Sequence, residues 1–236
     1  GYSSAASDVY KRQGHNWWTS CTCMGGLLAL SLQNELEEAR DAVKIINEVL
    51  PEWFEFAGDV LHQKPKTFDE TGGMYECLNY ANYGIQEALL FRLAWMNTHK
   101  EDKAIEIPQL EKLSDFFVHI CYPRTGMLYN INFGDSHKNT AAESSLMLLY
   151  AMGIQNDDMS KAPKVPKLKK SQLFKDFGWA TMRNSWEKDA TMLAVKSGYT
   201  WNHSHADANS FIVFHKGEDI IKDGGRCWYA NPEYRN

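Results

Sequence analysis

The sequence predicts an α+β protein of two domains, in which a helical part precedes a β part. Apolar residues recur at spacings of three and four from Met24 to about Gly153, as on one face of a helix. After residue 172 they gather instead in short β-branched and aromatic runs. Residues 155–172, between these two parts, carry two prolines and five lysines and few apolar side chains. We therefore expect a helical domain at 14–154, a linker at 155–172 and the start of a β-sandwich domain at 173–236, with residues 1–13 outside the native fold.

The helical part reads as five or six amphipathic helices in succession. One apolar stripe runs from Leu36 to Leu50, and later stripes include 53–61, 85–93, 110–120 and 142–152. We expect short loops at Pro51, Pro108 and Gly134. Consecutive helices with short connections form a bundle, a solenoid or a closed toroid, and the spacing alone does not choose among them.

The β part contains three clear strand signals. Residues 190–197, 210–215 and 219–222 are short and rich in β-branched or aromatic side chains. Lys216, Gly217 and Glu218 separate the last two as a hairpin turn. About four strands are expected, which is too few for a closed sandwich.

Composition excludes several classes of protein. The chain has 236 residues and a formal net charge of −5, whereas a nucleic-acid binder needs a concentrated basic surface. No apolar run approaches the roughly 18 residues of a membrane span. Five cysteines without a tight spacing do not indicate a disulfide scaffold. Residues 1–13 lack the apolar core of a signal peptide, and we expect both ends of the chain to be cut.

The densest polar cluster, residues 202–209, stands immediately before the strand at 210–215. In extended backbone, His203 and His205 project from the same face. Asp223 ends the returning strand, at the same end of the predicted hairpin. Two imidazoles and a carboxylate suit a divalent metal such as zinc. The structural alternative is that these side chains cap and brace the hairpin.

Two further clusters lie in the helical part. Residues 72–84 carry Glu76 on a glycine-opened loop and place Tyr80 and Tyr83 on one helix face, where phenols suit either packing or proton transfer. Residues 14–18 place a polar pair, His15 and Asn16, before two indoles. Asn16 fits either a helix N-cap or a donor to a substrate carboxylate, with Trp17 and Trp18 as the floor of a sugar subsite.

Taken together, the segments HNWWTSCTCMGGLLAL, ETGGMYECLNYANYG and NHSHADANSFIVFHKGEDIIKDGG resemble, in that order, the heparinase II/III-like polysaccharide lyases, which include alginate and oligo-alginate lyases. The resemblance covers residues 14–236. It implies an incomplete (α/α) toroid followed by the opening strands of an antiparallel β-sandwich, whose histidine loop reaches into the toroid cleft. It also implies export to the periplasm or secretion.

The resemblance implies roles for individual residues. Asn16 resembles the asparagine that neutralises the uronate carboxylate, assisted by His15. Tyr80 resembles the catalytic tyrosine, with Tyr83 as a register-dependent alternative, and His203 resembles the second base or carboxylate partner. Zinc is the implied cofactor, and its implied ligands are His205, Asp223 and a histidine beyond the end of this chain. The predicted substrate-binding residues are Trp17, Trp18, Glu76 and Asn209.

The expected function is a polysaccharide lyase that cleaves an acidic glycan containing uronic acid by β-elimination. One alternative is an inverting glycoside hydrolase on a helical toroid, with carboxylates such as Asp69, Glu70 or Glu76. Others are a non-catalytic glycan-binding protein and a zinc hydrolase. An unsaturated product separates the lyase from all of them.

Overall fold

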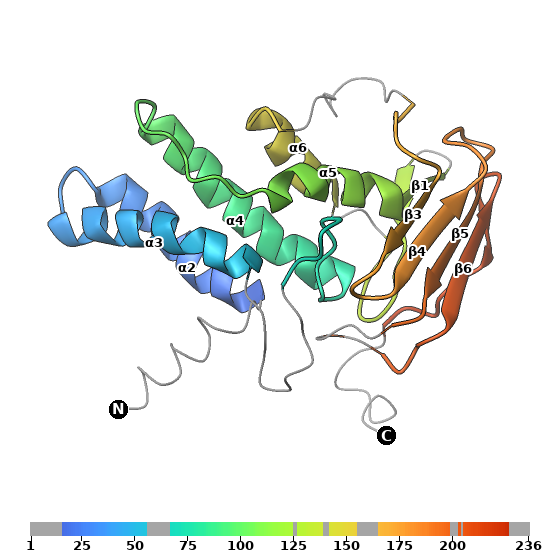
Figure 1. The fold of residues 1–236 in the computed structure, drawn as a ribbon. Coiled ribbons are helices and arrows are strands. Elements are labelled where there is room, and N and C mark those ends of the chain that lie inside the picture. Colours follow the sequence, from blue (N-terminus) through green and yellow to red (C-terminus); the bar gives the residue numbers. More distant parts are fainter. Residues whose placement is uncertain are drawn as a thin grey trace.

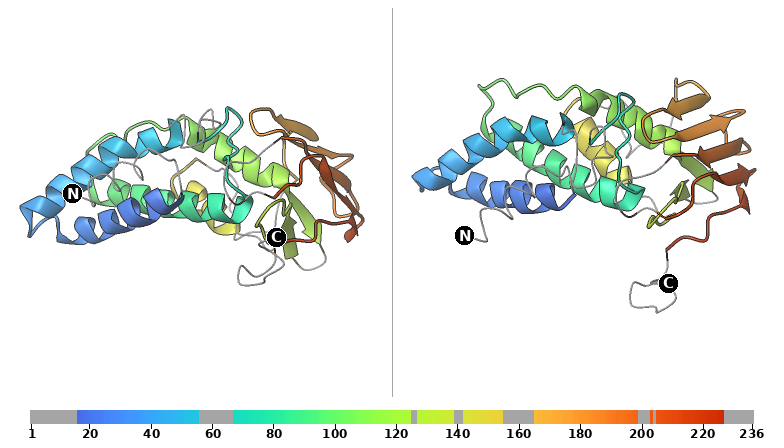
Figure 2. Two further views of the ribbon diagram at one scale, coloured as in Figure 1. Left: turned by 90° about the horizontal axis from the view of Figure 1, so that it is seen from below. Right: turned by 60° about the horizontal axis from the view of Figure 1, so that its bottom comes forward.

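A computed structural model describes residues 16–55, 67–124, 127–138, 142–154, 165–198, 203 and 205–226. The helices gather at one end of the molecule and an antiparallel sheet stands at the other (Figures 1 and 2). The predicted α+β fold class is confirmed. Residues 1–13 and most of the predicted linker lie outside the described residues, and the first strand of the sheet begins at Ser171, within the predicted linker range.

The helical part is built around one central helix. Its helices are α2 (Asn16–Leu32), α3 (Glu37–Glu55), α4 (Leu78–Thr98), α5 (Gln109–Ile120) and α6 (Ala142–Ala151). Helix α4 packs against α2 on one side and α6 on the other, while α2 also packs against α3. Two glycines allow the close approach of α2 and α4. A Cβ at Gly26 would lie 2.6 Å from the Phe91 ring, and one at Gly84 would lie 3.0 Å from the Cα of Asn16.

Two features of the helical part differ from the prediction. Pro51 does not end a helix, because α3 continues through it to Glu55. The first half is also not entirely helical: β1 (Cys121–Arg124) and β2 (Met127–Asn130) form an antiparallel hairpin directly after α5. Pro108 stands at the start of α5, and Gly134 lies in the loop after β2, as predicted.

The sheet has five strands in sequence order. They are β3 (Ser171–Phe174), β4 (Trp179–Arg183), β5 (Thr191–Lys196), β6 (Ser210–His215) and β7 (Glu218–Ile221). Every neighbouring pair is antiparallel. Lys216 and Gly217 have φ of 48° and 88°, which is the backbone of a tight hairpin turn, so the predicted turn is confirmed. The prediction identified β5, β6 and β7 and did not identify β3 and β4, which continue the same sheet.

One face of the sheet is buried against the helical part. Phe174 and Phe177 pack on Phe116 of α5, and Phe214 of β6 packs on Tyr122 of β1, so one hydrophobic core runs through both parts. The buried Arg183 of β4 adds a polar contact. Its Nη2 donates to the carbonyl oxygens of His119 and Cys121 at the end of α5, where helix carbonyls lack partners within the helix.

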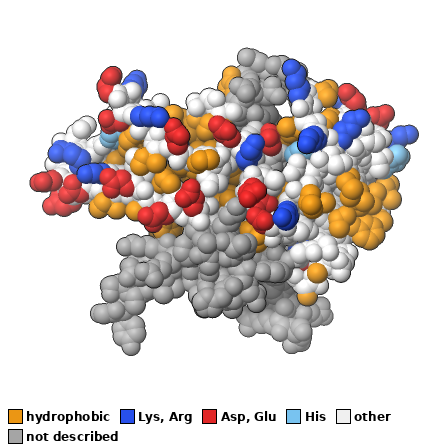
Figure 3. All heavy atoms as spheres, viewed as in Figure 1, with side chains coloured by type: hydrophobic (Ala, Val, Ile, Leu, Met, Phe, Trp, Pro, Cys, Tyr) orange, Lys and Arg blue, Asp and Glu red, His pale blue; other side chains and the backbone are white. Residues whose placement is uncertain are grey.

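The opposite face of the sheet is apolar and open to solvent. Exposed side chains there are Leu173, Met182, Phe211, Ile220 and Ile221. Figure 3 shows hydrophobic side chains gathered over this end of the molecule and acidic side chains along the helical end. Among the described residues, no helix combines the length and the apolar character needed to cross a membrane. The four described cysteines are free thiols.

Candidate functional site at the junction of the two parts

The loop after β2 is fixed on the first turn of α4. Asn79 donates its backbone N–H to Ser136 Oγ at 3.4 Å, and His137 donates its own to Asn79 Oδ1 at 3.1 Å. These two bonds hold Asp135 beside the N-terminal end of α4, where the helix dipole favours negative charge. The Asp135 side chain is 3% exposed. The sequence reasoning did not single out this residue.

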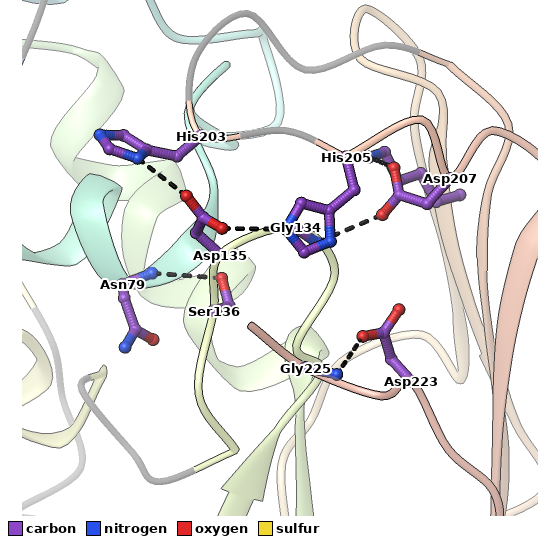
Figure 4. Close-up of polar contacts among 10 residues, drawn as sticks. Asn79, Gly134, Asp135, Ser136, His203, His205, Asp207, Asp223 and Gly225 are labelled. Atoms are coloured by element: carbon purple, nitrogen blue, oxygen red, sulfur yellow. Dashed lines mark hydrogen bonds and ion pairs between the residues drawn. The ribbon is translucent and has the colours of Figure 1, made fainter. Parts of the chain in front are cut away.

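Asp135 holds both histidines of the predicted cluster (Figure 4). Its Oδ2 lies 3.0 Å from His203 Nδ1, and its Oδ1 lies 2.9 Å from His205 Nε2. The backbone N–H of Asp135 also donates to the His203 carbonyl at 3.0 Å. His203 has φ of 53°, a left-handed conformation that a non-glycine residue adopts at some energetic cost. The histidines come from the β part and the carboxylate from the helical part, so this contact joins the two across the site.

Asp207 anchors the rest of the histidine loop. Its Oδ2 accepts from the Gly134 N–H at 3.2 Å, and its Oδ1 is paired with the buried Lys196 ammonium of β5. Asn209, with φ of 68°, accepts at Oδ1 from the Ser197 hydroxyl at 2.7 Å. Asp207 and Asn209 therefore brace the hairpin, which is the structural alternative given for this cluster. A role of Asn209 in substrate binding stays a prediction.

Tyr80 faces the histidine loop. Its ring stacks on the His203 imidazole, with ring centroids 3.4 Å apart and an angle of 4° between the planes. The histidine loop therefore reaches the tyrosine-bearing helix, in line with the resemblance, and the catalytic roles of both side chains stay predictions. The two residues are partly exposed and are held by different parts of the fold.

Tyr83 lies one turn further along α4 and contacts a different set of groups. Its hydroxyl lies 2.9 Å from Ser20 Oγ of α2, and Ser20 donates to Glu87 Oε1 at 3.3 Å. Burial raises the pKa of Glu87, while hydrogen bonds from Tyr83 and Ser20 act in the opposite direction. Tyr80 is the tyrosine that stacks on the His203 ring, and Tyr83 contacts Ser20 of α2 instead.

The predicted cluster at the start of α2 separates into three kinds of environment. Asn16 is buried beside Gly84 of α4, one turn from Tyr80, and its Oδ1 accepts from the Trp17 N–H at 3.0 Å. Trp17 is 57% exposed. Trp18 is 5% exposed and stacks on Trp53 in the core, so its predicted place on a sugar subsite is wrong. His15 lies outside the described residues.

The carboxylates proposed for a glycosidase have other environments. Asp69 Oδ1 accepts three hydrogen bonds from Thr71 and Gly73 and so builds the turn at 69–73. Glu70 is exposed, and Glu76 is buried, with 1% of its surface exposed. Asp69 therefore stabilises the turn, and its place in a hydrolase stays a prediction. The role of Glu76 stays open.

The predicted zinc ligands do not form a metal site by themselves. His205 Nε2 is turned to Asp135, and Asp223 Oδ1 accepts from the Gly225 N–H at 2.7 Å (Figure 4). Within the described residues, no three His, Cys, Asp or Glu side chains gather as metal ligands would. Zinc binding by His205 and Asp223 stays a prediction.

The comparisons with known proteins agree with this architecture. Residues 166–236 match the family model described as Heparinase II/III-like, C-terminal. This match confirms the predicted resemblance. A comparison with curated proteins gives no match.

Solved structures show a similar fold. One heparinase III has a TM-score of 0.64 and 16% identity over 91% of this chain and 35% of its own. A second heparinase III has a TM-score of 0.66 and 21% identity over 89% of this chain and 32% of its own. A heparan sulfate lyase HepC mutant from Pedobacter heparinus has a TM-score of 0.67 and 19% identity over 91% of this chain and 33% of its own. The chain thus spans about a third of the length of these structures, and at this identity the likeness concerns the fold.

Proposed function

We propose that this chain carries part of the active site of a polysaccharide lyase that cleaves a glycan containing uronic acid by β-elimination. The contact between Tyr80 and His203 is the observation that carries the proposal. The match of residues 166–236 to the heparinase II/III-like C-terminal family supports it. The same resemblance supports a periplasmic or secreted location, which fractionation of the native cells would test.

The chemistry requires three contributions from the protein. In a 4-linked uronic acid the C5–H is acidified by the adjacent carboxyl group, which delocalises the developing negative charge. The enzyme must neutralise that carboxylate, place a base beside C5 and protonate the leaving oxygen at C4. The C5–H bond breaks, a C4–C5 double bond forms, and the C4–O bond breaks without the addition of water.

Tyr80 and His203 supply the base and the acid. A neutral imidazole that donates its Nδ1 proton to Asp135 carries its lone pair on Nε2, the form that accepts a proton. The stacked phenol of Tyr80 lies against this ring and supplies a proton donor. Where the C5 proton and the leaving oxygen lie on one face of the sugar, Tyr80 serves in both steps. Where they lie on opposite faces, His203 takes the C5 proton.

Asn16 is the proposed partner of the uronate carboxylate. It lies beside Gly84, one turn of α4 from Tyr80. An amide donor held at a position of developing negative charge typically contributes about 3 to 4 kcal/mol to the transition state. No step of this mechanism passes through a metal ion.

The test is the ultraviolet absorbance of the new C4–C5 double bond. The intact protein is incubated with heparan sulfate, hyaluronan, chondroitin and alginate, and we expect absorbance to rise with one of them. Tyr80→Phe should abolish the rise. Tyr150→Phe, which changes an exposed tyrosine on α6, is the matched control and should not affect it.

Two outcomes would contradict the proposal. Chain cleavage with incorporation of solvent oxygen and no absorbance change would indicate a hydrolase. Binding without cleavage by the intact protein on all four polymers would indicate a glycan-binding protein.

A further inference from the structure

A polar cluster on α4 leads away from the contact between Tyr80 and His203. Tyr80, Tyr83 and Glu87 stand at positions i, i+3 and i+7 and therefore share one face of the helix. At about 1.5 Å per residue, Tyr83 lies about 4.5 Å and Glu87 about 10 Å further along the axis than Tyr80. The cluster thus borders the proposed cleavage site on one side.

The hydrogen bonds of this cluster have a direction. Ser20 has one hydroxyl proton, which it donates to Glu87 Oε1 at 3.3 Å. Because that proton is used, the Tyr83 hydroxyl, 2.9 Å from Ser20 Oγ, donates its own proton to the Ser20 oxygen. Its oxygen lone pairs are left as acceptors for a ligand, and the Tyr83 side chain is 46% exposed. The cluster therefore offers acceptors, not donors, to a bound molecule.

Glu87 places a carboxylate behind these hydroxyls, whose hydrogen bonds favour its ionised form while burial disfavours it. The residue is 8% exposed, and in the described part of the chain its Oε2 has no hydrogen-bond partner. Burial keeps solvent from screening a charge of this kind. The Glu87 carboxylate lies behind the Ser20 hydroxyl, so it acts through Ser20 and Tyr83 as a positioning residue.

The cluster also has an aromatic neighbour. Trp17 and Ser20 are three residues apart on α2 and share a face of that helix. The Trp17 side chain is 57% exposed, in contrast to the core residue Trp18. An exposed indole beside hydroxyl acceptors suits the combination of a flat apolar face and a polar edge that a sugar ring presents.

We propose that Tyr83 and Ser20, backed by Glu87 and flanked by Trp17, form a subsite for the sugar unit next to the one that is cleaved. This inference rests on the proposed function, and the subsite would help to decide which polymer the lyase prefers. The subsite accepts hydroxyl or amide N–H donors. It disfavours a carboxylate, which brings no proton to donate and meets a like charge. Chains in which a uronic acid alternates with an uncharged hexosamine should therefore bind better than chains with a carboxylate on every ring.

Calorimetry on the intact protein separates binding from turnover. The background is Tyr80→Phe, which is inactive under the proposed mechanism, and the probes are size-matched oligosaccharides from hyaluronan and from alginate. Adding Glu87→Gln keeps the acceptor oxygen and the shape but removes the charge. We expect it to shift the ratio of the two affinities toward the alginate probe by about tenfold, because the like-charge penalty is lost.

Tyr83→Phe removes the acceptor in otherwise active protein. We expect KM for the cleaved polymer to rise about five- to tenfold while kcat changes less than twofold, as for an interaction made equally in ground and transition states. Tyr150→Phe is again the control. Thermal unfolding of every variant shows whether the fold is retained, and Glu87→Gln should unfold within a few degrees of its parent.

The outcomes are distinguishable. If Tyr83→Phe abolishes kcat as Tyr80→Phe does, Tyr83 is catalytic and the subsite is refuted. If Glu87→Gln leaves the affinity ratio unchanged while both probes still bind, the subsite is refuted and the proposed function is untouched. If neither probe binds the intact protein and no polymer is cleaved, both proposals are refuted.

Discussion

Replacing Asp135 by asparagine tests the central geometry of the site. The carboxylate accepts from His203 Nδ1 and His205 Nε2 through separate oxygens. An asparagine side chain has one acceptor oxygen and one donor NH₂, so it satisfies one imidazole N–H and opposes the other. The change preserves size and removes one of the two hydrogen bonds between the imidazoles and the Asp135 side chain.

The magnitude follows from the bonds that are lost. A hydrogen bond to a charged group contributes about 1.5 to 3 kcal/mol, so the free energy of unfolding should fall by about 2 kcal/mol. The effect on catalysis should be larger than this loss alone implies. A displacement of about 1 Å in a reacting group costs on the order of a hundredfold in rate. We therefore expect kcat to fall about a hundredfold while KM changes only a few fold.

Asp219→Asn is the matched control. Asp219 is a mostly buried carboxylate of β7 that accepts from the Tyr122 hydroxyl at 3.1 Å and from Lys138 Nζ at 2.9 Å. It joins the two parts of the fold as Asp135 does, but through Tyr122 and Lys138. Its replacement should lower the free energy of unfolding by a similar amount and leave kcat within a few fold.

Two measurements decide the outcome for Asp135. Lyase rates of the two variants are compared after thermal unfolding has shown that both are folded. Independently of activity, the ¹⁵N chemical shifts of the His203 ring should show the proton on Nδ1 in the wild type and a changed tautomer population in Asp135→Asn. Equal loss of kcat in both variants, or a His203 ring with no proton on Nδ1 in the neutral wild type, would refute the reasoning.

Three further predictions concern catalysis, a buried ion pair and acid stability. Asn16→Ala should lower kcat by a hundredfold or more, because an oriented donor contributes about 3 to 4 kcal/mol to the transition state; an unchanged rate would remove Asn16 from the mechanism. Lys196→Met leaves the Asp207 carboxylate without its buried cation and should cost about 3 to 5 kcal/mol in urea unfolding at pH 7, with Lys196→Met/Asp207→Asn recovering part of the loss. Burial beside Arg183 lowers the pKa of His119 from 6.5 to about 4. The unfolded chain therefore binds this proton first, and as pH falls from about 6.5 to about 4 the fold loses up to about 3 kcal/mol of stability from this group. In His119→Gln this part of the pH dependence should disappear; an unchanged slope of unfolding free energy against pH would contradict the assignment.

Elements with strong local signals could be predicted from the sequence. The strand at 210–215 and its hairpin turn were predicted because a β-branched run ends at a residue pair suited to positive φ. The hairpin at 121–130 was missed because its two strands have four residues each and one includes Pro123, which local patterning does not favour in a strand. The first two residues of the strand at 171–174 fall in the predicted linker because the strand directly follows a lysine-rich segment.

Only those residues of the candidate site that form a short-range pattern in the sequence could be predicted. Two histidines two residues apart and two tyrosines three apart are visible as patterns. Asp135 is 68 residues from His203 and 70 from His205, and its partners become apparent only when the loop after β2 meets the β part. A signal for this loop in the sequence is the polar run at 135–140, which follows Gly134 and the largely apolar segment before it. Trp18 shows the opposite error, since nothing local distinguishes it from the exposed Trp17.

The arrangement of the site makes its geometry depend on the junction between the two parts. Tyr80 belongs to α4, Asp135 to a loop fixed on the start of α4, and His203 to a loop between two strands of the sheet. A shift of the sheet relative to α4 would therefore move the imidazole against the phenol without disturbing either part internally. The contacts that resist such a shift are the shared aromatic core, the Arg183 bonds to the end of α5 and the Asp207 bond to Gly134. Residues far from any substrate should thus alter kcat through the orientation of two rings, because close-packed interfaces change by discrete repacking and not by gradual deformation.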